Sequence, residues 1–315
     1  MLDSARLLAP LGPGRAARPE RVGVLGSMVL DRRWSRSGSM SGLPVWTVLS
    51  GHGGIARNVA ENLARLGAEA GFVGLGEPGP VGAAFERRLT GLGAAVLTAP
   101  VARSIGQFDC EISTEGDPVW AGIHLPAADE LSWPVVAAAT GWLRGARAVL
   151  VETGSPLATL TRLRVWANRR GVPLWGLPTD IAASGPRWEL FRSLALMVLN
   201  QFEAAELLGG GTGDPVTDAL ALTARGLPAV VVTTGARGAV CAAADGSWST
   251  YPARQVSCVD ATGAGDAFVA GLAVALARGE PWIAAVDHAM AAAAVIVGCG
   301  RSTCARLSRL DKDPI

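Results

Sequence analysis

The chain has 315 residues, of which 50% are hydrophobic and 17% are charged, so it can bury a sizeable core in one large domain or two small ones. The net charge of +1 provides no long-range attraction to nucleic acid or to an anionic membrane, and we expect neither as a partner. Lys312 is the only lysine, which excludes a P-loop, because the lysine of that loop reaches the terminal phosphates of a nucleotide.

Residues 1–20 are rich in Arg, Ala, Pro and Gly and lack an apolar segment of signal-peptide length, so we predict a mobile N-terminal tail. The longest apolar stretch, 284–297, contains Asp287 and His288 and is too short to span a bilayer; we predict a buried core helix there. The absence of a Cys-x-x-Cys pair favours free buried thiols of a cytosolic protein over disulfides or metal ligands. The five cysteines are Cys110, Cys241, Cys258, Cys299 and Cys304.

Short β-rich runs alternate with helical patterns along the chain. Strands that alternate with helices form mostly parallel sheets covered on both faces, so the pattern predicts an α/β fold. The predicted strands are 22–25, 70–73, 148–152, 174–177, 195–199 and 229–233. The predicted helices include 58–66, 81–91, 157–170 and 202–208. Two segments, about 32–50 and 106–124, interrupt the alternation and are predicted to be extended, with turns and no helix between.

The segment 259–271 reads Val-Asp-Ala-Thr-Gly-Ala-Gly-Asp-Ala-Phe-Val-Ala-Gly. Gly263 and Gly265 let the backbone approach a ligand closely, because they have no Cβ. The helix that begins near Ala264 leaves its first N–H groups without helical acceptors, which favours a phosphate at this place. Asp266 in such a site is best explained as a proton acceptor aimed at a hydroxyl group.

A plain loop, with Thr262 as helix cap and Asp266 offsetting the helix dipole, would use the same residues. A second signature favours the anion site: residues 53–67 read Gly-Gly-Ile-Ala-Arg-Asn-Val-Ala-Glu-Asn-Leu-Ala-Arg-Leu-Gly, a glycine pair before an amphipathic helix with Asn58 one turn in. Together the two signatures resemble those of the PfkB (ribokinase-like) carbohydrate and nucleoside kinases. The resemblance extends from Val22 to about Ser308.

This resemblance implies a ribokinase-like three-layer α/β/α domain over residues 21–315, with a mostly parallel central sheet. It also implies that the segments 32–50 and 106–124 form a small β-sheet lid over the sugar site, which in this family often serves as a homodimer interface. Trp34, Trp46 or Trp120 would serve that contact or pack in the core.

Residues that would bind the acceptor follow from the same resemblance. Asp31 resembles the carboxylate that accepts a sugar hydroxyl; a solvated turn residue is the alternative. Gly53, Gly54 and Asn58 would supply close-approach backbone and an amide, or form a plain helix entry. Glu152 matches, by a loose alignment, a second sugar-binding carboxylate.

Asn200 and Glu203 resemble the Asn-x-x-Glu motif of the family, which organises Mg²⁺ and its waters around the phosphates of ATP. Magnesium keeps several waters, so one glutamate acting partly through water is chemically adequate. The alternative is a first helical turn in which Glu203 offsets the dipole. Asp260 and Thr262 match a monovalent-cation loop, which implies activation by K⁺ with further carbonyls from residues 295–302.

Thr233, Gly235 and Gly238 belong to a glycine loop, Thr-Thr-Gly-Ala-Arg-Gly, that resembles the nucleotide-binding turn of these kinases. His288 aligns with a position that borders adenine, although a lone histidine on an Ala-rich helix could equally be a core residue. The resemblance thus implies that the protein binds ATP and Mg²⁺.

Pseudouridine is the acceptor that the resemblance favours, with transfer to its primary hydroxyl, because Arg57 stands where ribokinases carry a small residue. Two departures weaken this assignment: Val29 replaces a frequent Asn, and residues 74–79 lack an Asp pair. A ribokinase or another nucleoside or sugar kinase is the alternative within the family. A non-catalytic sugar- or nucleotide-binding protein is the alternative from another class.

An NAD-dependent oxidoreductase is disfavoured, although Gly-Leu-Gly-Glu-Pro-Gly at 74–79 follows a strand. A dinucleotide fingerprint expects an acidic residue about twenty positions later, and residues 94–102 contain none. The expectation is therefore a cytoplasmic kinase in which Asp266 acts as general base and the amides of residues 263–265 hold the phosphoryl group.

Overall fold

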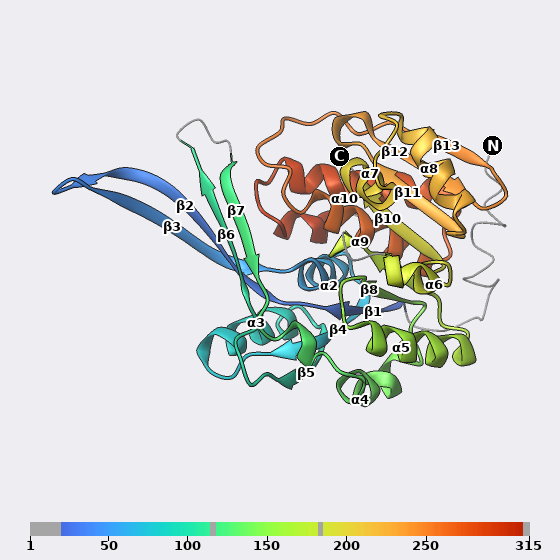
Figure 1. Ribbon diagram of the computed structural model, residues 1–315, viewed down its shortest axis with the longest axis horizontal. Coiled ribbons are helices and arrows are strands. Elements are labelled where there is room, and N and C mark those ends of the chain that lie inside the picture. Colours follow the sequence, from blue (N-terminus) through green and yellow to red (C-terminus); the bar gives the residue numbers. More distant parts are fainter. Residues whose placement is uncertain (1–19, 114–117, 182–184, 311–315) are drawn as a thin grey trace.

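A nine-stranded β-sheet forms the centre of the fold in the computed structural model, which describes residues 20–113, 118–181 and 185–310 (Figure 1). Seven neighbouring strands, β5, β4, β1, β8, β9, β10 and β11, pair in parallel. Beyond β11, the strands β12 and β13 extend the sheet with antiparallel pairing. The order across the sheet is β13-β12-β11-β10-β9-β8-β1-β4-β5. The bounds are β1 (Arg21–Gly26), β4 (Glu69–Gly76), β5 (Ala95–Pro100), β8 (Ala148–Glu152), β9 (Leu174–Leu177), β10 (Leu196–Asn200), β11 (Ala229–Thr233), β12 (Ala239–Ala243) and β13 (Trp248–Tyr251).

Helices cover both faces of this sheet, which confirms the predicted three-layer α/β/α architecture. Each face carries its own apolar cluster, and every residue of β8 is buried, as expected of a strand covered on both sides. One face packs against α2 (Ile55–Arg65), α3 (Pro80–Thr90), α9 (Ala264–Ala277) and α10 (Trp282–Val297). The other packs against α4 (Trp133–Leu143), α5 (Leu157–Arg170), α6 (Trp188–Phe191), α7 (Gln201–Leu208) and α8 (Pro215–Ala224). Short 3-10 helices lie at Ala128–Glu130, Gly185–Arg187, Gly235–Arg237 and Ala305–Arg309.

A separate four-stranded sheet forms the lid and confirms the two predicted extended segments. Its order is β3-β2-β6-β7, with β2 (Val29–Met40), β3 (Leu43–Gly53), β6 (Gln107–Ile112) and β7 (Pro118–His124). Ser41 and Gly42 both have positive φ, 51° and 80°, which makes a two-residue turn that matches the twist of the β2–β3 hairpin. The hairpin projects well beyond the body of the molecule (Figure 1).

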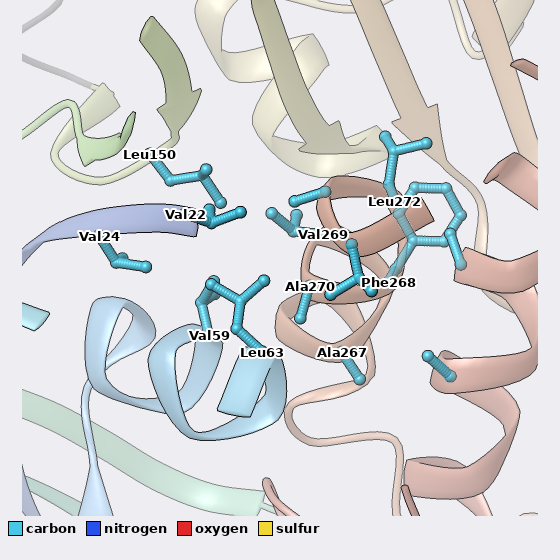
Figure 2. Close-up of a cluster of buried hydrophobic side chains, with 14 of the residues drawn as sticks. Val22, Val24, Val59, Leu63, Leu150, Ala267, Phe268, Val269, Ala270 and Leu272 are labelled. Carbon is cyan, nitrogen blue, oxygen red and sulfur yellow. The ribbon is translucent and has the colours of Figure 1, made fainter. Parts of the chain in front are cut away.

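An apolar cluster locks α2 against α9 and the central strands (Figure 2). Val59 and Leu63 of α2 lie beside Ala267 and Ala270 of α9, and Val22 of β1 lies above them (Figure 2). All five side chains are almost fully excluded from solvent. Because the first turns of both helices start from this packed region, the cluster fixes the polar residues at the two helix starts relative to each other.

The long apolar stretch forms a buried core helix, as predicted, within α10. It lies very close to α9, where a Cβ on Gly271 would come within 2.9 Å of the Cα of Ala289. Within the described ranges, the structure contains no helix with the length and hydropathy needed to cross a membrane.

The prediction that all five cysteines are free buried thiols is wrong. Cys299 and Cys304 form a disulfide, because the chain turns back after α10 and brings their Cα atoms to 6.4 Å, within bridging range. Cys110 and Cys241 are free and buried as predicted, whereas Cys258 is free and exposed. The predicted tail lies outside the described residues except for Glu20, which receives a hydrogen bond from Arg278 at 3.0 Å.

Candidate active site

A cavity of about 770 Å³ lies between the lid and the carboxyl ends of β1 and β8. From β1 the chain proceeds to β4 and β5 on one side and later returns to β8 on the other side. Such a reversal of strand order opens a crevice at the strand ends, which is where open α/β sheets bind ligands. Several residues predicted from the sequence line this cavity: Asp31, Gly54, Asn58, Glu152, Thr262, Gly263 and Asp266.

Asp266 lies in the first turn of α9 and faces the cavity. Its Oδ2 accepts a hydrogen bond of 2.9 Å from Nδ2 of Asn58, which comes from the first turn of α2. Burial raises the pKa of Asp266 to about 7, the Asn58 hydrogen bond lowers it, and the charges of Glu152 and Glu203 raise it. A carboxyl group with a pKa near neutrality is well matched to accept a proton from a hydroxyl.

The turn before α9 requires glycine at its first position. Gly263 has φ of 82°, and a Cβ there would collide with the backbone of Ser302. A Cβ on Gly265 would meet no atom within 4 Å, so the space in front of that residue is open for a ligand. The amide of Ala264, in contrast, donates to the carbonyl of Ala261 at 3.1 Å. Of the predicted amides, that of Ala264 is therefore already engaged.

Asp31 extends from β2 of the lid into the cavity, opposite the helix starts. Burial raises its pKa to about 6, against the lowering charges of Arg57 and Arg33. Gly53 makes this position possible, because a Cβ on Gly53 would collide with the Asp31 carboxylate. Gly54 follows with φ of 95° and caps α2, so both glycines of the pair have a steric role.

Glu152 ends β8 and is 6% exposed. Its oxygens accept hydrogen bonds from the amide of Ala56 at 2.8 Å and from the amide and hydroxyl of Ser27 at 3.1 and 2.9 Å. Burial raises its pKa. Glu152 thus ties the end of β1 to the start of α2 while it lines the cavity.

Asn200 and Glu203 meet at the end of β10, beside Thr233 at the end of β11, with Asn200 and Thr233 in parallel register. They form a capping box for α7, in which the Asn200 side chain accepts from the amide of Glu203 and Glu203 Oε2 accepts from the amide of Asn200 at 2.7 Å. Burial raises the pKa of Glu203. Glu203 therefore lies in the first turn of α7, as the alternative expects, and it uses Oε2 rather than Oε1 in the capping box.

The loop after β11 turns at Gly235 and Gly238, which have φ of 61° and 101°. A Cβ on Gly238 would collide with the carbonyl of Tyr251, so this turn also depends on glycine. His288 borders a second cavity of about 290 Å³ on the α10 side of the molecule. Within the described ranges, no group of three or more His, Cys, Asp or Glu side chains could hold a metal ion.

Comparisons with known proteins show the family to which the chain belongs. Residues 21–306 match the model of the family described as pfkB family carbohydrate kinase. The chain belongs to this family. It is therefore a phosphotransferase that acts on a hydroxyl group of a sugar or nucleoside.

Three curated relatives each share 30% identity with the chain. A fructokinase of Klebsiella pneumoniae aligns over 82% of this chain and 84% of its own length. An aminoimidazole riboside kinase of Salmonella typhimurium aligns over 77% and 78%. A bifunctional protein HldE of Nitrobacter winogradskyi aligns over 82% of this chain, which spans only 55% of that protein.

Solved structures support the ribokinase-like fold. Ribokinase from Giardia lamblia superposes with a TM-score of 0.79 at 20% identity, covering 92% of this chain and 99% of that one. Ribokinase from Arabidopsis thaliana in complex with ribose and ATP gives 0.77 at 22% identity, covering 94% and 98%.

Arg57 does not lie where the sequence prediction placed it in this pfkB kinase. Its side chain is only 2% exposed, and it is absent from the described residues that line the large cavity. Its guanidinium instead contacts Glu61, the carbonyl of His52 and the side chain of Asn58. The predicted direct contact of Arg57 with the acceptor is therefore not supported; Arg57 contacts the cavity residue Asn58 instead.

Asp260 is also engaged by protein groups. Its Oδ2 accepts from Arg33 of β2 at 2.7 Å, and its Oδ1 accepts from the amide of Thr262 at 2.8 Å. The loop predicted to bind a monovalent cation is therefore tied to the lid by an ion pair that sequence spacing could not reveal.

Several residues of the cavity were not predicted. Ser27 holds Glu152, and Asp180 follows β9 with φ of 52°, an uncommon conformation for a residue with a side chain. The available signal was their position within three residues of the ends of β1 and β9. The apolar lining includes Leu75, Ile105, Phe108, Ile123, Leu125 and Leu131.

Proposed function

We propose that the protein is an ATP-dependent kinase that phosphorylates the primary hydroxyl of a ribosyl compound, with pseudouridine as the preferred acceptor. The observation that carries the proposal is the placement of Asp266 at the start of α9, facing the cavity with a pKa of about 7. Membership of the pfkB family supports the reaction class.

The chemistry follows from the positions of the side chains. Asp266 accepts the proton of the acceptor hydroxyl, whose oxygen forms a bond to the terminal phosphorus of ATP while the bond to ADP breaks. The open first turn of α9, with Gly263 and Gly265, stabilises the negative charge of the transferred group. Asp31 and Asn58 orient the acceptor from the lid and from α2. The lid excludes water and so limits hydrolysis of ATP.

Asn200, Glu203, Thr233, Gly235 and Gly238 would bind the phosphates of ATP and its Mg²⁺ at the ends of β10 and β11. The donor set fits magnesium, because Glu203 keeps one carboxylate oxygen beyond its capping bond and the ion needs few protein ligands. Magnesium supplies positive charge that neutralises the phosphates. His288 would lie near the nucleotide base.

Pseudouridine is favoured by the apolar lining of the cavity and by the Ala-Arg-Asn sequence at residues 56–58, which resembles that of pseudouridine kinases even though Arg57 itself does not line the cavity. Phe108, Ile105 and Leu131 belong to the apolar lining of the cavity, which suits the flat face of a base. A sugar kinase or another nucleoside kinase is the second candidate, since relatives include a fructokinase and an aminoimidazole riboside kinase.

Assembly and ion dependence extend the proposal. The lid exposes Met40, Leu43 and Trp120, at 68%, 70% and 55%, and we infer that it pairs with the lid of a second copy. We also infer that K⁺ activates the enzyme through Thr262 and neighbouring carbonyls. ATP is supplied in the cytoplasm, where we expect the enzyme to act.

The test is ADP formation from ATP and Mg²⁺ with pseudouridine, uridine, adenosine, aminoimidazole riboside, ribose and fructose, in K⁺ and in Na⁺ buffers. Turnover on pseudouridine that is lost in Asp266→Asn supports the reaction and the acceptor. Turnover only on one of the other five compounds would support the kinase reaction but would reject pseudouridine as the acceptor. Ligand binding without turnover on all six would favour the non-catalytic alternative.

A further inference from the structure

A buried ion cluster lies behind the wall of the cavity that α2 forms. Glu61 of α2 is fully buried and accepts hydrogen bonds from three arginines. Arg65 Nε and Arg88 Nη2 each reach Glu61 Oε1 at 2.9 Å, and Arg57 Nη2 contacts Oε2. Although burial raises the pKa of Glu61, the charge of Arg57 and the hydrogen bonds from Arg88 and Arg65 lower it to about 2. Glu61 is therefore a permanent anion that orients the guanidinium groups around it.

Arg57 differs from the other two arginines because its second terminal nitrogen, Nη1, points towards the active site. Its Nη1 donates to Oδ1 of Asn58 at 2.6 Å and to the carbonyl of His52 at 2.8 Å. Asn58 in turn donates from Nδ2 to Oδ2 of Asp266 at 2.9 Å. Glu61, Arg57, Asn58 and Asp266 thus form one continuous chain of hydrogen bonds from α2 to α9.

The order of donors and acceptors in this chain determines how the amide of Asn58 points. A guanidinium has only donors, so the amide must turn its oxygen towards Arg57. Its NH₂ group is then forced to face Asp266, where it donates to the carboxylate. If the amide turned over, Asn58 would present an NH₂ group to Arg57 and a carbonyl oxygen to an ionised Asp266, and both contacts would be repulsive.

We propose that Arg57 is a positioning residue for phosphoryl transfer: anchored by Glu61, it fixes the amide of Asn58 so that Asn58 holds the Asp266 carboxylate towards the acceptor hydroxyl. The inference rests on the proposed role of Asp266 as general base. It assigns to Arg57 an indirect role in place of acceptor recognition.

The charged groups around this chain of hydrogen bonds determine how removal of Arg57 changes the pKa of Asp266. Besides Asn58, the groups that act on Asp266 are Arg57 from α2, Glu152 from β8 and Glu203 from α7. Arg57 is the only cation among them, so its loss leaves Asp266 facing two carboxylates and a loosely held amide. Arg57 itself also interacts with Arg88 and Asp31. Its removal should therefore raise the pKa of Asp266.

The experiment compares Arg57→Met with Arg65→Met. Both substitutions remove one cation from Glu61 and leave it two others, but only Arg57 contacts Asn58. For Arg57→Met we expect kcat at pH 7 to fall about tenfold or more, as a misplaced catalytic group would cause. The acidic limb of the kcat/KM profile should move to higher pH, and KM for ATP should stay within about twofold. Arg65→Met should change neither kcat nor the limb.

A double-mutant cycle with Asn58→Ala tests whether Arg57 acts through Asn58. We expect Arg57→Met to reduce kcat much less in the Asn58→Ala background than in the wild type, because residues that act in one network are not additive. Arg65→Met should leave kcat unchanged in both backgrounds. Additive effects of Arg57→Met and Asn58→Ala would overturn the proposal.

Equal loss of activity in Arg57→Met and Arg65→Met, with no shift of the acidic limb, would also overturn it, since both would then act only on folding. If Arg57→Met does not fold, Arg57→Lys replaces it, because one ammonium group cannot contact both Glu61 and Asn58 as the guanidinium does. Asp266→Asn is measured in parallel. Full activity of Asp266→Asn would reject the proposed function itself. If Asp266→Asn is inactive but Arg57→Met has wild-type kcat, only this inference is rejected.

Discussion

Asp266 shows how a small set of contacts makes an ordinary carboxyl group into a base that works near neutral pH. Burial raises its pKa to about 7, and the hydrogen bond from Asn58 keeps the carboxylate form accessible. Asp31, on the opposite wall, has its pKa raised to about 6 by burial. Burial thus raises the pKa values of both carboxyl groups towards neutrality.

The pH dependence of kcat/KM for the acceptor should follow from these two values. Asp266 must be deprotonated to accept a proton, so kcat/KM should fall about tenfold per unit as the pH drops below about 7. Below about pH 6 Asp31 is protonated as well, and the slope should steepen to about two. In Asp31→Asn the slope should remain one throughout. A wild-type rate that is flat from pH 5 to pH 8 would contradict the assignment of Asp266.

A second prediction concerns the space beside Asp31. Gly53→Ala places a methyl group against the Asp31 carboxylate and should displace it, raising KM for the acceptor by about tenfold or more. Gly51→Ala, two residues earlier in β3, is the matched control, because its Cβ would meet no atom within 4 Å. Steady-state kinetics at saturating ATP measure both variants. Equal KM values in the two would show that Asp31 does not bind the acceptor.

Residue types and spacing predicted part of this site. Gly263, Gly265 and Asp266 could be predicted because a small-residue turn before an apolar helix is typical of an anion-binding helix start. The contact between Arg57 and Glu61 is an i,i+4 pair within α2, so its spacing was visible in the sequence, but the approach of Arg88 from α3 to Glu61 depends on tertiary packing and gives no local pattern.

At the scale of elements, α2 and α9 deliver Asn58 and Asp266 to the cavity, and the two helices pack against each other through apolar side chains. The cluster in Figure 2 places their first turns side by side, so Asn58 and Asp266 meet without any loop between them. Sites built on packed helices hold their geometry better than sites on loops. The helix that contains Asn58 was predicted over 58–66, but it begins at Ile55, because Gly54 at φ of 95° starts it directly after β3.

The lid is joined to the body by a half-exposed ion pair between Arg33 of β2 and Asp260. Such pairs contribute at most about 1 kcal/mol, so Arg33→Ala should raise KM for the acceptor by only about twofold to fivefold. The difference from wild type should shrink in about 0.5 M NaCl, where screening weakens the pair. Arg36→Ala, on an exposed part of the same strand, is the control. A KM that is unchanged at low salt would show that the pair does not hold the lid.

At the scale of the whole molecule, the alternation of strands and helices was enough to predict the three-layer fold. The predicted bounds of β8, β9, β11 and α5 are confirmed to the residue, since each lies between clear turn signals and the three strands are almost entirely buried. The disulfide between Cys299 and Cys304 was missed, because its formation depends on how the chain turns after α10. The lid was predicted as extended segments, but its ion pair with the body depends on tertiary placement.

The most direct test of the central claim is the turnover number of Asp266→Asn at pH 8, measured with the acceptor that gives the highest wild-type rate. The account predicts a fall in kcat of about 10²- to 10⁴-fold, with the melting temperature and the affinity for ATP unchanged, because only the proton acceptor is lost. A kcat within about threefold of the wild-type value would contradict the account.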